Sequence, residues 1–141
     1  MIVYADTSAL AKLVLDEDGT DEMHTLRATA EMISSAAIAY VELRATAAAA
    51  VRANRIASAH RQELARSVED LWDALSPVPV NDVLLHRAGD LAERMHLRAY
   101  DAVHLASLQA CGTASDVAFA CWDVDLRNAA RSLGYTLLPD A

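Results

Sequence analysis

The sequence of 141 residues contains few glycines and few lysines, and both shortages exclude classes of protein. Its four glycines, at positions 19, 89, 112 and 134, form no glycine-rich turn of the kind that dinucleotide-binding folds need after a strand. Lys12 is the only lysine. Phosphatases of the haloacid-dehalogenase type and phospho-accepting receiver domains need a lysine later in the chain to balance phosphoryl charge. Neither class fits this sequence.

Cysteine is scarce too, and long apolar runs are missing. Cys111 and Cys121 have neither metal-ligand spacing nor a redox motif, so we interpret them as small core residues in a reducing compartment. No apolar run approaches the roughly 20 residues that cross a bilayer. No basic segment precedes the apolar start at residues 1–4, so we expect no signal peptide there. We therefore expect a cytoplasmic protein without a membrane segment.

What the sequence does contain is a large apolar fraction, 54%, with 23% charged residues. These values predict one compact domain over residues 1–141. The net charge of −8 argues at first against a nucleic-acid partner. The cationic residues are almost all arginine, however, and the guanidinium group binds phosphate better than the ammonium group of lysine does. Acids gathered in one pocket would also leave the rim less acidic than the total suggests.

Short apolar segments alternate with longer helical patterns along the chain. The expected strands are 2–5, 32–35, 76–80, 117–122 and 135–138. The expected helices are 9–15, one from Thr20, 38–52, one capped by Ser58, 81–95 capped by Asn81, 101–111 and 123–133. Two prolines confine segment 76–80 to an edge of the sheet. This alternation predicts an α/β fold whose mainly parallel sheet is covered on both faces.

Four acids fall where such a fold binds ligands, beyond the carboxyl ends of its strands. Asp6 follows the first strand, Asp123 follows the strand 117–122, Glu42 lies in the first turns of the helix 38–52, and Asp101 opens its own helix. Each aspartate has a simpler interpretation as a helix cap or first-turn anion. Glu42 has one as a solvated residue paired with an arginine.

Taken together, the four acids favour a cation site. Clustered carboxylates repel one another unless a cation lies between them. Oxygen ligands without a histidine or cysteine cluster suit Mg²⁺ or Mn²⁺ and not zinc. Mg²⁺ commonly combines a few carboxylates with water and substrate phosphate. The pattern therefore indicates phosphoryl-transfer or nuclease chemistry.

At this point the residues resemble a known family, the PIN-domain ribonucleases, and most closely the VapC-type toxins of prokaryotic toxin–antitoxin pairs. The resemblance covers nearly the whole chain and implies a three-layer α/β/α sandwich. The motifs that carry it are Asp6-Thr7-Ser8, Glu42 in its alanine-rich helix, Tyr100-Asp101-Ala102-Val103-His104-Leu105-Ala106, Trp122-Asp123-Val124-Asp125-Leu126 and the ending Ala129-Ala130-Arg131-Ser132-Leu133-Gly134.

The resemblance implies a Mg²⁺- or Mn²⁺-dependent endoribonuclease that hydrolyses RNA phosphodiesters with metal-activated water. Asp6 and Asp101 would be the principal metal ligands. Glu42 and Asp123 would hold a second metal or orient the attacking water. Asp125 competes with Asp123 for the fourth position, and the family pattern favours Asp123 because it directly follows the strand. Supporting hydrogen bonds to a carboxylate or the scissile phosphate would come from Thr7 or Ser8.

The family also implies a homodimer and a small antitoxin that occupies the acidic groove. Two alternatives remain open: a housekeeping PIN nuclease without an antitoxin, and a non-catalytic interaction module whose acids merely cap helices. We expect His104 to be a packed, hydrogen-bonded core residue. Arg44, Arg98 and Arg127 either contact RNA phosphate or form salt bridges to nearby acids.

Overall fold

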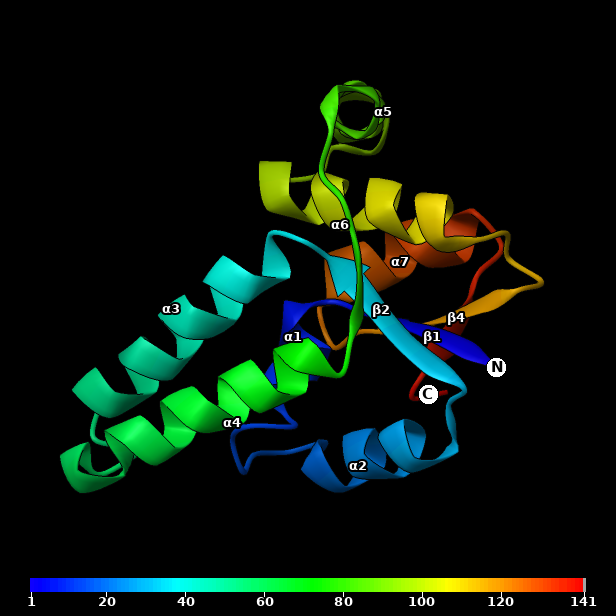
Figure 1. Cartoon of the computed structure of the whole chain (residues 1–141). Helices are drawn as coiled ribbons and strands as arrows, with labels where there is room; N and C mark the ends of the chain where they lie inside the picture. The colour runs from blue at the N-terminus through cyan, green and yellow to red at the C-terminus, as the bar shows by residue number, and fades with distance from the viewer. Residues whose placement is uncertain (141) are drawn as a thin grey trace.

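A computed structural model describes residues 1–140 of the chain (Figure 1). The strands are β1 (Ile2–Ala5), β2 (Met32–Ala36), β3 (Ser76–Val78), β4 (Val117–Ala120) and β5 (Thr136–Leu138). The helices are α1 (Thr7–Ala11), α2 (Thr20–Thr29), α3 (Ala39–Arg52), α4 (Arg61–Asp73), α5 (Asp82–Met95), α6 (Ala99–Cys111) and α7 (Val124–Ser132), with a 3₁₀ turn at Ser58–His60. None of the helices within residues 1–140 is both long and apolar enough to cross a bilayer.

The sheet has five strands in the order β3-β2-β1-β4-β5, and all neighbouring pairs are parallel. The prediction of a parallel sheet is confirmed, and so is the edge position of the proline-containing strand. Ala5 at the end of β1 pairs with Ala120 at the end of β4. Asp6 and Cys121 directly follow these two residues, so the central strands deliver them side by side at one edge of the sheet.

Helices cover both faces of the sheet, which confirms the three-layer α/β/α arrangement. Figure 1 shows α5, α6 and α7 on one side of the strands and α1, α2 and α4 on the other. Successive side chains of β1 enter different cores: Val3 and Ala5 face the core shared with α1–α4, and Tyr4 faces the core shared with α5–α7. The Tyr4 hydroxyl thereby contacts His104 on α6.

The first helix differs from the predicted range of 9–15, since α1 ends at Ala11. The N–H groups of Leu13 and Val14 bond to carbonyl groups three residues earlier, which tightens the chain into a turn. Lys12, in that turn, is buried and pairs with Glu17 at 3.1 Å. The apolar run therefore continues past the helix because the turn is buried too.

Two predicted helix starts also need correction. Ser58 does not cap α4: it begins a short 3₁₀ turn, and α4 follows from Arg61 without a side-chain cap. Helix α6 begins at Ala99, so Asp101 lies in its first turn and not at its cap. The cap of α5 by Asn81, whose side chain accepts the Leu84 N–H, is confirmed.

Candidate metal site and its polar network

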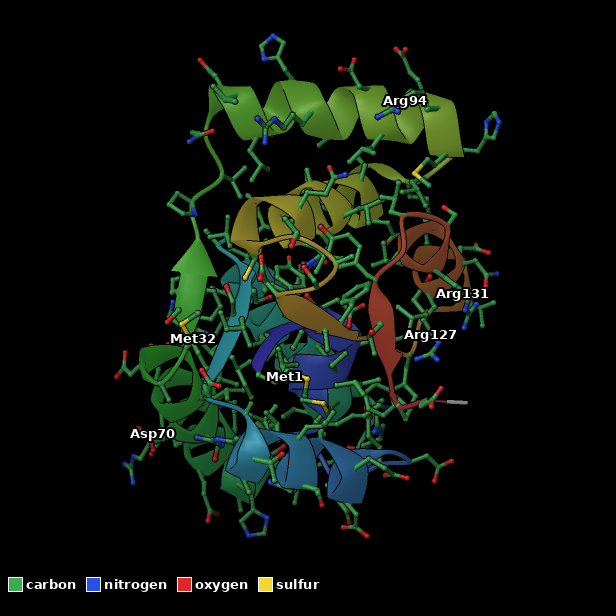
Figure 2. All side chains as sticks on the ribbon, turned by 90° about the vertical axis from the view of Figure 1, so that its right-hand side faces the viewer. Met1, Met32, Asp70, Arg94, Arg127 and Arg131 are labelled. Carbon is green, nitrogen blue, oxygen red and sulfur yellow. The ribbon has the colours of Figure 1, made fainter. Side chains whose placement is uncertain are left out.

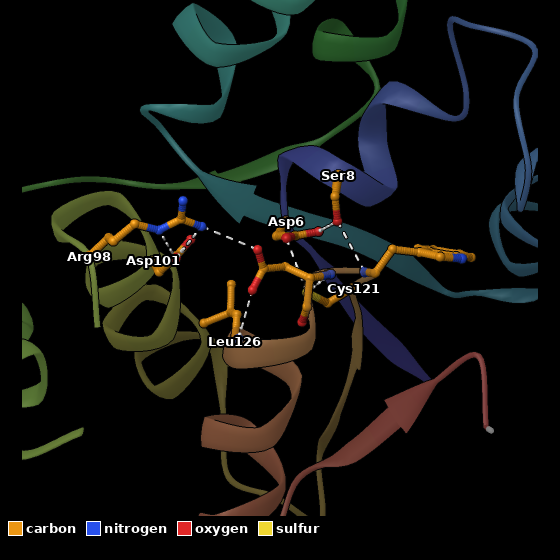
Figure 3. A network of polar contacts seen from close by, with 8 residues as sticks. Asp6, Ser8, Arg98, Asp101, Cys121 and Leu126 are labelled. Atoms are coloured by element: carbon orange, nitrogen blue, oxygen red, sulfur yellow. Dashed lines mark hydrogen bonds and ion pairs between the residues drawn. The ribbon is translucent and has the colours of Figure 1, made fainter. Parts of the chain in front are cut away.

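Asp6 joins β1 to α1 and is held from three directions. Its Oδ1 accepts the Ser8 hydroxyl at 2.7 Å and the Ala9 N–H at 3.1 Å, which makes it the N-cap of α1. Its Oδ2 accepts the thiol of Cys121 at 3.1 Å (Figure 3). With 4% of its surface exposed, the carboxylate is fixed in place by the ends of β1 and β4.

The electrostatic setting of Asp6 favours a cation. Burial raises the pKa of Asp6 and outweighs the interactions with His104 and Ser8 that lower it. Burial and the neighbouring Asp6 also raise the pKa of the Cys121 thiol far above its ordinary value. The thiol therefore stays protonated and acts as a hydrogen-bond donor to the carboxylate. A positive charge nearby would stabilise ionised Asp6.

Glu42 lies in the first turn of α3 and belongs to a second polar chain. Its Oε1 accepts the Thr7 hydroxyl at 2.8 Å and lies 2.8 Å from His104 Nε2. On the other side of the ring, His104 Nδ1 lies 2.8 Å from the Tyr4 hydroxyl. With the proton on Nε2, His104 donates to Glu42 and accepts from Tyr4, so the whole chain is satisfied.

This arrangement disagrees with the simpler interpretation of Glu42 as a solvated residue paired with an arginine. Burial alone would raise the pKa of Glu42, but the hydrogen bond and charge interaction with His104 outweigh it and lower the pKa. The expectation that His104 is a buried, hydrogen-bonded residue is confirmed. The same residue also orients an acid of the candidate site.

Asp101 and Asp123 share one cation, the guanidinium of Arg98 (Figure 3). Arg98 NH2 lies 3.1 Å from Asp101 Oδ2 and 3.3 Å from Asp123 Oδ2. The Arg98 side chain is 77% exposed, against 18% for Asp101 and 30% for Asp123. The two carboxylates are therefore partly buried, and they already hold a positive charge between them that is itself exposed.

Cys121 connects Asp123 to the buried part of the site. Its Sγ, which donates to Asp6, also accepts the Asp123 N–H at 3.3 Å. Asp123 itself caps α7, because its Oδ1 accepts the Leu126 N–H at 2.9 Å. Asp125, the competing acid, is exposed in the first turn of α7. The bonds to Cys121 and Leu126 make Asp123 part of this network.

The four acids gather at one end of the sheet in linked pairs and not as one tight cluster. No three histidine, cysteine, aspartate or glutamate side chains within residues 1–140 are grouped closely enough to hold a metal ion together. Mg²⁺ needs only one or two carboxylates with water and phosphate, so two acids around one cation match its usual coordination. The guanidinium of Arg98 marks a place where the fold accommodates positive charge. The oxygen donors are of the type that hard divalent cations prefer.

Four residues of the polar network were not among the predicted site residues: Cys121, His104, Tyr4 and Arg98. The spacing contains a signal for Arg98, which lies three residues before Asp101 at the start of a helix. No local signal identifies Cys121, whose contact with Asp6 crosses 115 positions of sequence.

The other arginines considered above do not reach the acids of the site. Arg44 pairs with Glu69 on α4. Arg127, labelled in Figure 2 beside the last strand, donates to the carbonyl oxygens of Cys121, Leu138 and Pro139. Its contacts tie the end of β5 to α7, which is a structural role.

Comparisons with known proteins agree with this architecture. The family model described as PIN domain matches residues 3–118. Over 138 residues the chain is 36% identical to Ribonuclease VapC45 of Mycobacterium tuberculosis strain CDC 1551 / Oshkosh and to Ribonuclease VapC49 of strain ATCC 25618 / H37Rv. Each alignment covers 98% of this chain and 95% of the relative.

A solved structure shows the same fold. The crystal structure of PAE2754 from Pyrobaculum aerophilum superimposes with a TM-score of 0.69 over 98% of this chain and 84% of the other, at 16% sequence identity. At this identity the likeness establishes the fold and nothing further. The family match and the two full-length relatives establish the rest: this chain belongs to the PIN-domain family, among its VapC-type members.

Proposed function

We propose that this chain is a divalent-metal-dependent endoribonuclease and the toxin of a toxin–antitoxin pair. The observation that carries the proposal is the arrangement of Asp101 and Asp123 around a shared positive charge, beside the buried carboxylate of Asp6. The fold places acids together here at a cost that a catalytic cation would offset. Both full-length relatives are named ribonucleases.

Asp101 and Asp123 are the residues that would hold the cation, with Asp6 behind them, joined to Asp123 through the Cys121 thiol. Mg²⁺ is our choice, with Mn²⁺ as the substitute, because the donors are carboxylate oxygens. When bound, such a cation supplies Lewis-acid activation of water and neutralises charge on the phosphate. The protein's own part is to fix the carboxylates: Ser8 and Cys121 hold Asp6 at its two oxygens.

Glu42 would act beside this group, as the acid that orients the attacking water or holds a second cation. Its carboxylate has a fixed direction because Thr7 and His104 both bind Oε1. The second oxygen carries no side-chain hydrogen bond within residues 1–140 and stays available for a water molecule or cation. Thr7 thus supports Glu42, while Ser8 supports Asp6.

The proposed substrate is RNA, and the proposed partners are a cognate antitoxin and a second copy of this chain. A housekeeping PIN nuclease would share the site and lack the antitoxin, so a short gene for a DNA-binding protein directly upstream favours the toxin. An interaction module without catalysis would show no cleavage and no stabilisation by metal.

The test compares cleavage of a mixed RNA pool by wild type and Asp101→Asn, each with Mg²⁺ and with chelator. Wild type with Mg²⁺ should cleave, and the variant should lose on the order of 10³-fold in rate because a cation ligand is gone. Circular dichroism should show an intact fold, since Asp101 does not cap its helix and its side-chain partner is the exposed Arg98. Equal cleavage in all four reactions would point to a contaminant and defeat the proposal.

A further inference from the structure

Arg98 occupies a position that a cation ordinarily avoids. It is the N-cap residue of α6, and the positive end of the helix dipole disfavours a guanidinium there. The N-terminus of α7 also lies close, because its cap Asp123 is the second partner of Arg98. The two carboxylates, and not the helices, therefore hold the guanidinium in place.

The two ion pairs of Arg98 are also weak enough to break. Its side chain is the most exposed of the three partners, and exposed ion pairs contribute little net stability. Both of its contacts use Oδ2 atoms, of Asp101 and Asp123, the same acids to which the cation is assigned above. A divalent cation brings twice the charge to these oxygens, so the guanidinium and the cation compete for one place.

We propose that Arg98 is a positioning residue that couples metal binding to RNA binding, an inference that rests on the proposed function. Without metal, it bridges Asp101 and Asp123 and keeps them from repelling each other. When a divalent cation takes the carboxylates, the guanidinium is freed for a backbone phosphate of the RNA. The planar guanidinium of arginine suits phosphate. On a chain of net charge −8, a cation beside the acids also reduces the repulsion of the RNA backbone.

Coupling of this kind is reciprocal. If metal frees Arg98 for phosphate, then a phosphate backbone that draws Arg98 away must tighten metal binding by the same factor. A salt bridge with no role beyond stability would lack this property. The coupling therefore separates a switch from a static pair.

The first measurement is Mn²⁺ affinity without nucleic acid, by titration calorimetry or by the electron paramagnetic resonance signal of free Mn²⁺. Arg98→Gln should bind Mn²⁺ about fivefold tighter than wild type, because its competitor is gone. Arg98→Lys should fall between them, since an ammonium keeps the charge and loses the fork. The matched control is Arg66→Gln, which removes the same charge from an exposed position on α4 and should resemble wild type.

The second measurement repeats the titration with a short single-stranded DNA oligonucleotide, which carries the phosphate backbone without being the proposed substrate. After subtraction of Mn²⁺ bound by the oligonucleotide alone, it should tighten Mn²⁺ binding by wild type and by Arg66→Gln. The gain should be at least halved in Arg98→Gln. Equal gains in all three proteins would overturn the coupling, and so would equal Mn²⁺ affinities of Arg98→Gln and Arg66→Gln.

The outcomes also separate this inference from the proposed function. If wild type binds Mn²⁺ and cleaves RNA while Arg98→Gln is indistinguishable from the control, only the role of Arg98 is contradicted and the proposed function stands. A wild type that neither binds Mn²⁺ nor cleaves RNA sinks both, because no cation then competes for the carboxylates.

Discussion

The candidate site has a buried half, whose acids are held by the buried side chains of His104 and Cys121, and an exposed half, whose acids are held by the exposed side chain of Arg98. In the buried half, Asp6 and Glu42 receive hydrogen bonds from hydroxyl, thiol and imidazole groups that the strands and helices fix in place. In the exposed half, Asp101 and Asp123 share the long side chain of Arg98 as their cation, and Asp123 also caps α7. The fold thus preorganises one pair of acids and leaves the other pair open to exchange of its cation.

The difference has a physical reason. An unpartnered carboxylate costs more the more deeply it is buried, so the protein must supply donors to the buried Asp6 and the partly buried Glu42 before any ligand arrives. Arg98 is largely exposed, so it can leave Asp101 and Asp123 at small cost. The buried half should therefore influence stability, and the exposed half should influence metal and substrate binding.

The largest effect on stability is expected from His104→Ala. The change removes a buried ring and leaves the Tyr4 hydroxyl and Glu42 without their partner. We expect a loss of about 3 kcal/mol in the free energy of unfolding, measured by urea denaturation.

The control for this prediction is His86→Ala, because His86 is an exposed histidine on α5. It should change the free energy of unfolding by less than about 0.5 kcal/mol. Similar losses in the two variants would mean that the Tyr4–His104–Glu42 chain does not organise the buried half.

A smaller effect, of opposite sign, is expected from Asp6→Asn in the presence of chelator. Because burial raises the pKa of Asp6 in the folded state, its ionised form costs stability above that pKa. An amide keeps an oxygen to accept from Ser8 and Ala9 and carries no charge, so the variant should be more stable at pH 7 by on the order of 1 kcal/mol.

The pH dependence gives this prediction its check. The gain should shrink as the pH falls through the folded and then the unfolded pKa of Asp6, because both states of wild type are then protonated. Urea denaturation at several pH values measures it, with the exposed Asp125→Asn as the control that shows no such gain. An Asp6→Asn protein less stable than wild type at every pH would contradict this account of the buried half.

Much of the fold could be predicted from sequence because its signals are local. Apolar runs mark the strands, the prolines of 76–80 mark an edge, and Asn81 marks a cap, and the structure has all three. The boundary of α1 could not be predicted this way. Its apolar residues continue through a buried turn, where hydrophobicity does not distinguish a helix from a tightened chain.

The acids of the site could be predicted from the sequence, whereas most of their hydrogen-bond partners could not. The acids follow strand ends or open helices, so topology alone brings them to one edge of the sheet. Arg98 was named as a possible partner of nearby acids, but Cys121 and Tyr4 could not be inferred as members of the network, because their contacts with Asp6 and His104 cross 115 and 100 positions of sequence. Such contacts depend on strand order and register, which the chain reveals only when folded.

The central claim is that Asp101 and Asp123, the two acids bridged by Arg98, bind the divalent cation. The most direct test is a Mn²⁺ titration of wild type, Asp123→Asn and Asp125→Asn, two variants with the same change of charge two residues apart. We predict that Asp123→Asn loses at least about tenfold in Mn²⁺ affinity, since it removes a ligand, while Asp125→Asn stays within about twofold of wild type. Equal Mn²⁺ affinities of the two variants, or a greater loss in Asp125→Asn, would contradict the account.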